Sequence, residues 1–237
     1  MSGRDFDPAQ PEWMDRDQPV STELEVDLGN LAAINRHFGG RRIWRHFVHR
    51  WMRPGQHYRI IDFATGGGDG PRCVVEVARQ IGATVEVTAV DAQPATLEIA
   101  RRWSADFPEI RFRQADVLAP NPLFEEVYDY AFCSLALHHF STADATSLLR
   151  RLRASAVRGV LAADLRRGFA CRAGAWLVTS TLYRAAMTKH DARMSARRAF
   201  SFEELDELAR AADWPGFGHR RFAVGRQAVW WEAKEAV

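Results

Sequence analysis

Aspartate and histidine side chains follow five apolar runs of this sequence, at the points where the runs end. In chain order these residues are Asp62, Asp91, Asp116, His138, His139 and Asp164. A carboxylate accepts hydrogen bonds from ligand hydroxyl and amino groups, and an imidazole exchanges protons near neutral pH. In a parallel sheet, the carboxyl ends of the strands border the ligand crevice. These residue types at these positions therefore predict a binding crevice that contains a proton-transferring group.

The first apolar run leads directly into a glycine-rich turn, Thr65-Gly66-Gly67-Gly68-Asp69-Gly70. Glycines let the backbone approach a ligand closely, and the helix that follows directs free N–H groups at it. The dinucleotide pattern G-x-G-x-x-G fails here, because its third position, counted from Gly66 and Gly68, falls on Pro71. A nucleoside triphosphate P-loop is excluded as well, since no lysine lies near the turn. The ligand is therefore expected to be of another kind.

Residues 62–68 resemble motif I, D-x-G-x-G-x-G, of the class I S-adenosylmethionine-dependent methyltransferases. Asp62, Gly66 and Gly68 are in register, and Ala64 stands at the first glycine, as it also does in ubiquinone and menaquinone biosynthesis methyltransferases. The resemblance implies S-adenosylmethionine as the cofactor and S-adenosylhomocysteine as its product. It assigns Asp62 to orienting the turn and meeting the methionine end of the cofactor. The resemblance also implies that the backbone of the turn passes under the aminoacyl group and ribose of the cofactor, at Ala64, Thr65, Gly66 and Gly68.

The ends of the next strands extend this resemblance. Asp91 closes the second run, where a carboxylate accepts both ribose hydroxyl protons, whereas NADP would favour an arginine there. Asp116 matches the family position that meets the adenine amino group. Residues 128–140 resemble the fourth-strand motif of the same enzymes. The resemblance covers residues 58–164 well and the C-terminal part loosely, and it also assigns to the cofactor Ala92, Val117, Ser134 and Leu135.

Methyl transfer asks the protein mainly to align donor and acceptor, and alignment supplies much of the rate. A base is needed only when the acceptor must lose a proton, and no metal follows from this chemistry. His138 and His139 are candidates for that base or for substrate contact, although one imidazole can instead brace its loop. Asp164 can receive an acceptor hydroxyl or form a buried ion pair with a neighbouring arginine. His190 is a further candidate, in a stretch that predicts a polar loop over residues 188–199.

Short apolar runs that alternate with helical patterns from residue 58 onward predict a parallel sheet with crossover helices. Two further apolar stretches, 217–224 and 227–232, predict a terminal antiparallel hairpin. The resulting fold class is α/β, with a Rossmann-like, seven-stranded, mostly parallel sheet and helices on both faces. The expected strands before the hairpin are 58–63, 85–90, 110–114, 128–135 and 159–164, and the expected helices of this part are 70–81, 95–104, 143–154, 169–187 and 201–212.

The N-terminal part has a different character. Residues 1–20 are rich in Asp, Pro and Gln and predict a mobile arm, although its apolar residues Trp13 and Met14 could fold over another segment. Two helices follow, one on each side of Gly39-Gly40, because apolar residues recur there at helical spacing. We therefore expect an N-terminal arm and helical lid over residues 1–55. A methyltransferase domain is expected over residues 56–237, with an inserted helix and loop at about residues 168–200.

The lid is expected to supply part of the acceptor pocket. Residues 30–40 resemble the lid helix of a bacterial methyltransferase group associated with polyketide and quinone-type phenols. That resemblance implies that Asn35 and Phe38 meet donor or acceptor from above. Other aromatic residues lie in segments that cover the crevice in similar enzymes, which suits a flat or apolar acceptor. These further substrate candidates are Trp13, Trp176 and Tyr183.

The composition is that of an ordinary globular protein, with 237 residues of which 47% are hydrophobic and 26% charged. No apolar run approaches the roughly 20 residues that cross a bilayer, and the N-terminus lacks the apolar core of a secretory signal. A cytoplasmic protein is expected. The cysteines at positions 73, 133 and 171 lie far apart, which predicts reduced, buried thiols.

The net charge of +2 argues against a dedicated nucleic-acid binder. Residues 36–59 nevertheless hold seven arginines and four histidines without one carboxylate, a patch that suits nucleic acid, an anionic lipid surface or an acidic substrate.

The function favoured by these patterns is O-methylation of a small aromatic, phenolic or polyketide-like acceptor. One alternative is C-methylation of a quinone-type precursor. A second is an RNA or protein acceptor, against which stands Ser134-Leu135-Ala136-Leu137 where many amino-group methyltransferases carry an Asn/Asp-Pro-Pro-Tyr motif. A third is a non-catalytic module that binds the cofactor. A small-molecule acceptor without a nucleic-acid partner is expected, with the chain a monomer or homodimer.

Overall fold

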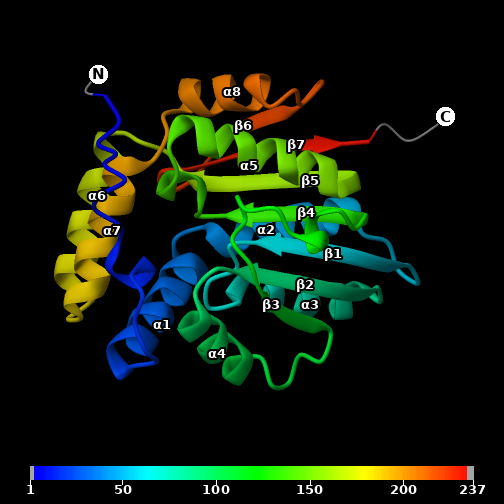
Figure 1. Ribbon diagram of the computed structural model, residues 1–237, viewed down its shortest axis with the longest axis horizontal. Coiled ribbons are helices and arrows are strands. Elements are labelled where there is room, and N and C mark those ends of the chain that lie inside the picture. Colours follow the sequence, from blue (N-terminus) through cyan, green and yellow to red (C-terminus); the bar gives the residue numbers. More distant parts are fainter. Residues whose placement is uncertain (1–2, 234–237) are drawn as a thin grey trace.

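A computed structural model of the protein describes residues 3–233 (Figure 1). At its centre lies a seven-stranded sheet with the strand order β3-β2-β1-β4-β5-β7-β6. The first five strands are parallel, and β7 is antiparallel to both β5 and β6, so the predicted mostly parallel sheet with a terminal hairpin is confirmed. The strands are β1 (His57–Phe63), β2 (Thr84–Asp91), β3 (Ile110–Gln114), β4 (Tyr128–Ser134), β5 (Ala156–Leu165), β6 (Gly218–Phe222) and β7 (Arg226–Glu232).

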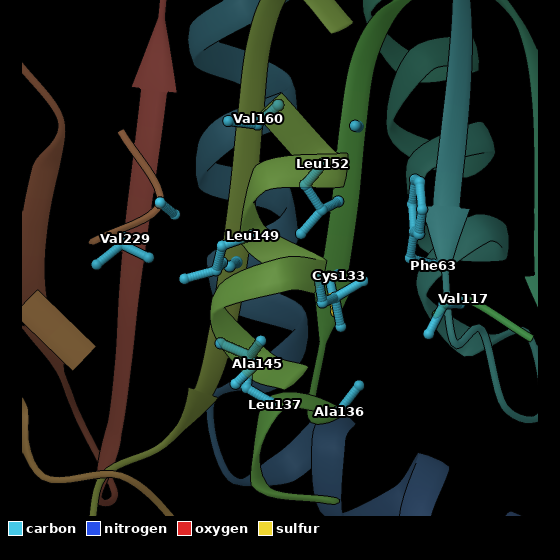
Figure 2. Packing of buried hydrophobic residues seen from close by; sticks show 14 of the residues in the cluster. Phe63, Val117, Cys133, Ala136, Leu137, Ala145, Leu149, Leu152, Val160 and Val229 are labelled. Carbon is cyan, nitrogen blue, oxygen red and sulfur yellow. The ribbon is translucent and has the colours of Figure 1, made fainter. Parts of the chain in front are cut away.

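Helices cover both faces of the sheet, because successive side chains of a strand point to opposite faces. On one face, Ile61 and Phe63 of β1 join a core with α5 (Thr142–Ser155) and α8 (Phe202–Ala211). Figure 2 shows Leu149 and Leu152 of α5 packed over the sheet on this face. Fully burying one such leucine stabilises a fold by about 1.5–3 kcal/mol.

The opposite face carries α2 (Gly40–Trp51) and α3 (Asp69–Ile81). The apolar stripe of α2 includes Trp44 and Phe47, which are buried in the core together with Ile60 of β1. This packing leaves no room for a side chain at Gly70, since a Cβ there would stand 2.6 Å from the Trp44 ring. The glycine turn is thus fixed to the sheet by the helix that precedes β1.

The remaining helices gather near the carboxyl ends of the parallel strands, at the left of Figure 1. They are α1 (Thr22–His37), α4 (Pro94–Trp103), α6 (Phe169–Thr181) and α7 (Ala186–Arg198). The prediction of a polar loop over residues 188–199 is wrong, since most of that stretch is α7. Its buried face includes Met187, Asp191, Met194 and Arg198, which follow a helical spacing. Two of these four residues are charged. Apolar periodicity alone could not reveal such a helix.

The N-terminal arm also differs from the prediction of a mobile segment. Residues 3–20 pack against α7 and include a short 3₁₀ helix, η1 (Trp13–Asp15). Arg4 donates hydrogen bonds to the backbone oxygens of His138 at 2.9 Å and Phe140 at 2.6 Å. Asp191 of α7 accepts the backbone N–H groups of Trp13 at 2.9 Å and Met14 at 3.0 Å. Polar contacts across the whole chain, invisible to local patterning, hold the arm in place.

The three cysteines Cys73, Cys133 and Cys171 are free and buried, as predicted. Within residues 3–233, none of the helices combines the length and the apolar character that crossing a membrane requires.

Candidate functional site

A cavity of about 1040 Å³ lies at the carboxyl ends of the parallel strands. Ligand pockets are usually about 300–1,000 Å³, so this one has room for two small molecules side by side. Its wall combines the strand-end loops with α1, α6, α7 and the N-terminal arm. From the predicted cofactor residues the structure brings into this wall Ala64, Thr65, Gly66, Asp91, Ala92, Asp116, Val117, Ser134 and Leu135.

Asp91, at the end of β2, joins two of the strand-end loops. Its Oδ2 accepts the backbone N–H of Gly66 at 2.8 Å, and its Oδ1 accepts that of Gln93 at 3.0 Å. Burial raises the pKa of Asp91, while these two N–H donors act in the opposite direction. The carboxylate is therefore held rigidly against the glycine turn and still has lone pairs for hydroxyl donors in the cavity.

The other two strand-end carboxylates lie in contrasting environments. Asp116 is exposed at the cavity wall, where its Oδ1 accepts the backbone N–H of Leu118 at 2.8 Å. Asp62 is buried beneath the turn and lies outside the wall. Burial raises the pKa of Asp62 to about 8, so its carboxyl group holds its proton at pH 7. The predicted direct contact of Asp62 with the methionine end remains a prediction.

The glycine turn presents open backbone to the cavity. Gly66 has φ +55°, and no atom lies within 4 Å of the place that a Cβ would occupy there. Ala64 has φ 54°, which is strained for a residue with a side chain and explains why the resembling motif carries glycine at this place. Gly68 lies outside the wall, and a Cβ there would stand 3.1 Å from Phe112 and Arg72. Gly68 has φ +75°, the left-handed region that favours glycine, and it caps the start of α3.

The loop after β4 also contains a non-glycine residue with a positive φ. Leu135 has φ 56°, and its backbone N–H donates to the oxygen of Ala163 in β5 at 2.8 Å. Non-glycine residues in this region of backbone space cluster at binding sites, where the surrounding structure holds them. The short helix η3 (Leu137–His139) follows and turns both histidines toward the cavity wall.

His138 forms a buried pair with Asp164, the single aspartate of β5, next to its carboxyl end. Asp164 Oδ1 lies 2.6 Å from His138 Nδ1, and Oδ2 accepts the His138 backbone N–H at 3.0 Å. Burial by itself raises the pKa of Asp164, but the contacts with His138 outweigh it and the pKa is lowered. An ionised carboxylate only accepts, so Nδ1 donates to Asp164, and Nε2 is the ring nitrogen left for other contacts.

His139 is paired with a carboxylate of the N-terminal arm. Its Nδ1 lies 2.6 Å from Asp15 Oδ2. Burial lowers the pKa of His139, but Asp15 and Glu12 together raise it to about 10. His139 is therefore positively charged at neutral pH. It is unsuited to accept a proton there and well suited to stabilise an anionic oxygen.

Glu12 is a residue of this site that the sequence did not single out. Its carboxylate is 2% exposed and accepts the Ser195 hydroxyl at 2.8 Å. The same carboxylate lies 3.8 Å from His138 Nε2 and 4.0 Å from His139 Nε2. Burial raises the pKa of Glu12. The signal available in the sequence was the apolar pair Trp13-Met14 within a polar arm, which marks a segment that packs against the domain.

The structure divides the remaining predicted residues. Asn35 and Phe38 of the lid region lie in the cavity wall. His190 lies outside it, with Nδ1 at 2.7 Å from Asp191 Oδ1 and its ring stacked on Trp13 at 4.3 Å. Trp176 is 58% exposed on the far side of α6. The predicted residues that the structure does not bring into the wall are Asp62, Gly68, Trp13, Asp164, Trp176, Tyr183 and His190.

Glu12, His138 and His139 also have the residue types that bind transition metals. One ligand atom from each lies within 4.8 Å of the others. Ligands around a tetrahedral zinc ion stand roughly 3.4 Å apart, from bond lengths near 2.1 Å, whereas the Glu12 oxygens lie 3.8 Å from His138 Nε2 and 4.0 Å from His139 Nε2.

Two sequence comparisons find similarity to methyltransferases. A family model described as a methyltransferase domain matches residues 60–159. A 2-phytyl-1,4-naphtoquinone methyltransferase of Thermosynechococcus vestitus is 33% identical over 82 residues, which are 35% of this chain and 35% of that protein. The match thus spans about a third of the length of this curated relative.

Solved structures share the fold. An O-methyltransferase family protein from Burkholderia thailandensis has a TM-score of 0.66 at 14% identity, over 88% of this chain and 59% of that one. The plantazolicin methyltransferase BpumL in complex with SAH has a TM-score of 0.61 at 13% identity, over 90% and 97%. A methyltransferase from Aquifex aeolicus gives 0.59 at 15% identity, over 87% and 96%. The match to the methyltransferase domain runs from β1 to the start of β5, and these solved methyltransferases have the same fold as this chain.

Proposed function

We propose that the protein transfers a methyl group from S-adenosylmethionine to a hydroxyl oxygen of a small aromatic or polyketide-like acceptor. The observation that carries this proposal is that one cavity has both the strand-end loops and the His138 ring in its wall. Apolar wall residues such as Leu31, Phe38 and Phe140 favour a flat, apolar acceptor.

The residues present fit the cofactor. The open backbone at Gly66 accommodates a group in direct contact with the turn, and Asp91 beside it has free lone pairs for ribose hydroxyls. Asp116 and Val117 would border the adenine, and Ser134 and Leu135 the methionine end. When bound, S-adenosylmethionine supplies an electrophilic methyl group on a sulfonium and leaves as S-adenosylhomocysteine.

His138 would take the proton of the acceptor hydroxyl at Nε2. Its Nδ1 is committed to Asp164, which fixes both the tautomer and the plane of the ring. Positively charged His139 would stabilise the oxygen as it becomes anionic. Glu12, between the two Nε2 atoms, would accept a second polar group of the acceptor. Asp164 and Asp15 act through these rings as positioning residues.

A panel of phenols, hydroquinones and polyketide-like hydroxyl compounds tests the proposal directly. Each compound is incubated with the protein and S-adenosylmethionine, and methylated products are measured by mass spectrometry together with S-adenosylhomocysteine. We expect methoxy products from a subset of the panel. If the protein binds the cofactor but releases no S-adenosylhomocysteine with any compound of a broad panel, the result would instead favour a non-catalytic binding module.

A second candidate is methylation at carbon of a quinone-type precursor. It is favoured by the similarity to the 2-phytyl-1,4-naphtoquinone methyltransferase, which covers 82 residues at 33% identity. The same active-site base would serve, since an activated carbon acid also loses a proton. Nuclear magnetic resonance of the product separates the two outcomes, because a methoxy group and a ring methyl group have different carbon shifts.

A further inference from the structure

Helix α6 is apolar on both of its long faces. Its inner face, with Cys171, Val178 and Thr179, forms part of the cavity wall. Its outer face carries Phe169, Trp176 and Leu177, at the spacing i, i+7 and i+8 that places them on one stripe. These side chains are 87%, 58% and 57% exposed, and Leu182, just beyond the helix, is 64% exposed. A helix that is apolar all round is normally buried on all sides.

The surroundings of this stripe are basic. Between Leu165 and Ser201 the sequence has seven arginines and one lysine, and its one acid, Asp191, is 0% exposed and bonded to arm amides. Arg172 and Arg184 are exposed, and the Arg193 guanidinium lies 5.9 Å from the ring centre of Trp176. The stripe is therefore bordered by positive charge and lacks exposed carboxylates along α6 and α7.

These charges decide between the possible occupants of the stripe. A second copy related by twofold symmetry would bring the same surface against itself, arginine against arginine. An anionic lipid surface instead complements the arginines, and its acyl region accepts the aromatic and aliphatic side chains. Helices that lie in the membrane interface combine Trp, Phe and Leu on one face with basic residues beside them. Each basic side chain near an anionic surface adds to the attraction.

We propose that the outer face of α6, together with Leu182, docks on an anionic lipid surface. Phe169, Trp176 and Leu177 would enter the interface, and Arg172 and Arg184 would contact lipid headgroups. Because the inner face of the same helix borders the cavity, docking would bring the cavity next to the lipid. The proposal is independent of the acceptor, since it concerns a surface outside the cavity.

Vesicle flotation of the full chain, without cofactor or acceptor, tests this docking. We expect flotation with vesicles of equal parts phosphatidylcholine and phosphatidylglycerol, little with phosphatidylcholine alone, and release at high salt. Leu177→Glu and Arg172→Glu should each lower the floated fraction at least fivefold. Val127→Glu is the matched control, because Val127 is 55% exposed on a different part of the surface and should leave flotation unchanged. Circular dichroism verifies that each variant is folded.

Failure of the wild-type protein to float with anionic vesicles would overturn the proposal, as would equal flotation of Leu177→Glu. A dimer in light scattering that Leu177→Glu converts to a monomer would assign the stripe to a second copy instead. None of these outcomes bears on methyl transfer, which is measured separately in detergent-free solution with the acceptor panel.

Discussion

Asp164 directs both carboxylate oxygens at His138, one at the ring and one at the backbone N–H, and its Oδ1 also accepts the backbone N–H of Leu165 at 2.6 Å. This arrangement fixes where the histidine sits and which nitrogen holds its proton. The sequence indicated that His138 and Asp164 end neighbouring strands and so share an edge of the sheet. It left open whether Asp164 pairs with an arginine, because the residues that contact a strand end often come from distant segments of the chain.

Replacing His138 by glutamine should lower kcat by about 10²–10⁴-fold, the usual contribution of a positioned base. Cofactor affinity should stay within a factor of a few, because His138 lies beyond the strand-end loops that would hold the cofactor. Steady-state kinetics and calorimetry measure the two quantities.

His190→Gln is the matched control for that substitution, since His190 also pairs with an aspartate but lies outside the cavity wall. It should leave kcat nearly unchanged. A loss in His190→Gln as large as that in His138→Gln, or no loss in His138→Gln, would show that the base has been misassigned.

The His139 and Asp15 pair predicts a dependence of stability on pH. The pKa of His139 is raised from 6.5 to about 10, so its contribution is complete below pH 6.5 and is lost as the pH rises through 10. The pKa of Asp15 is lowered from 3.8, because the contacts with His139 outweigh burial, and Asp15 stays ionised across this range. Asp15→Asn should therefore lower stability at pH 7 by about 1.5–3 kcal/mol, the value of a hydrogen bond between charged groups.

Denaturant unfolding at a series of pH values checks this expectation. The wild-type protein should lose more stability than Asp15→Asn between pH 7 and pH 10, and Asp17→Asn, at an exposed position of the same arm, should follow the wild type. Parallel curves for wild type and Asp15→Asn would contradict the pairing.

At the scale of elements, β1, β4 and β5 were predictable because each contains an apolar run that the sheet buries on both faces. Expected and observed strands differ at their ends by a few residues, as with β5, expected from residue 159 and observed from Ala156. Helix α7 and the N-terminal arm were mispredicted for one shared reason. They hold each other through polar contacts between residues 12–14 and residues 191–195, which leave no apolar period in either segment.

The basic segment 36–59 also shows that local sequence patterns do not reveal contacts with distant residues. It lacks carboxylates in sequence, yet in the fold Arg41 pairs with Glu76, Arg50 with Glu232 and Arg59 with Glu126. Three of its seven arginines are therefore partly neutralised by acids from other elements. This observation weakens the case for an RNA acceptor, which would need a continuous positive surface.

Attachment of the arm to α7 is itself testable. Asp191→Ala removes the acceptor of the Trp13 and Met14 amides, so hydrogen exchange of residues 13 and 14 should accelerate at least tenfold. Asp206→Ala on α8 is the control, because the Asp206 carboxylate contacts the side chains of Arg210 and His219. Unchanged exchange in Asp191→Ala would mean that the arm is held by other contacts.

At the scale of the whole molecule, the order of the strands places the ends of β1, β2 and β4 around one cavity, with β3 following β2 at the edge. The motif resemblance predicted a cofactor edge for that cavity from residues 62–135. The side proposed for the acceptor was harder to predict, because Glu12 and Ser195 come from the arm and α7, and they meet only in the folded chain. Local sequence patterns were enough to predict the strand-end loops at one side of the cavity. The other side is formed by long-range packing, which these patterns do not reveal.

Calorimetric titration of S-adenosylmethionine into the wild-type protein and into Asp91→Ala tests the central claim most directly. Asp129→Ala is the control, since Asp129 is paired with Arg158 at the amino end of β4, the opposite edge of the sheet. We predict binding to the wild type and to Asp129→Ala, and at least a hundredfold loss of affinity in folded Asp91→Ala. Equal affinity of Asp91→Ala and the wild type would contradict the claim that the strand-end cavity holds the cofactor.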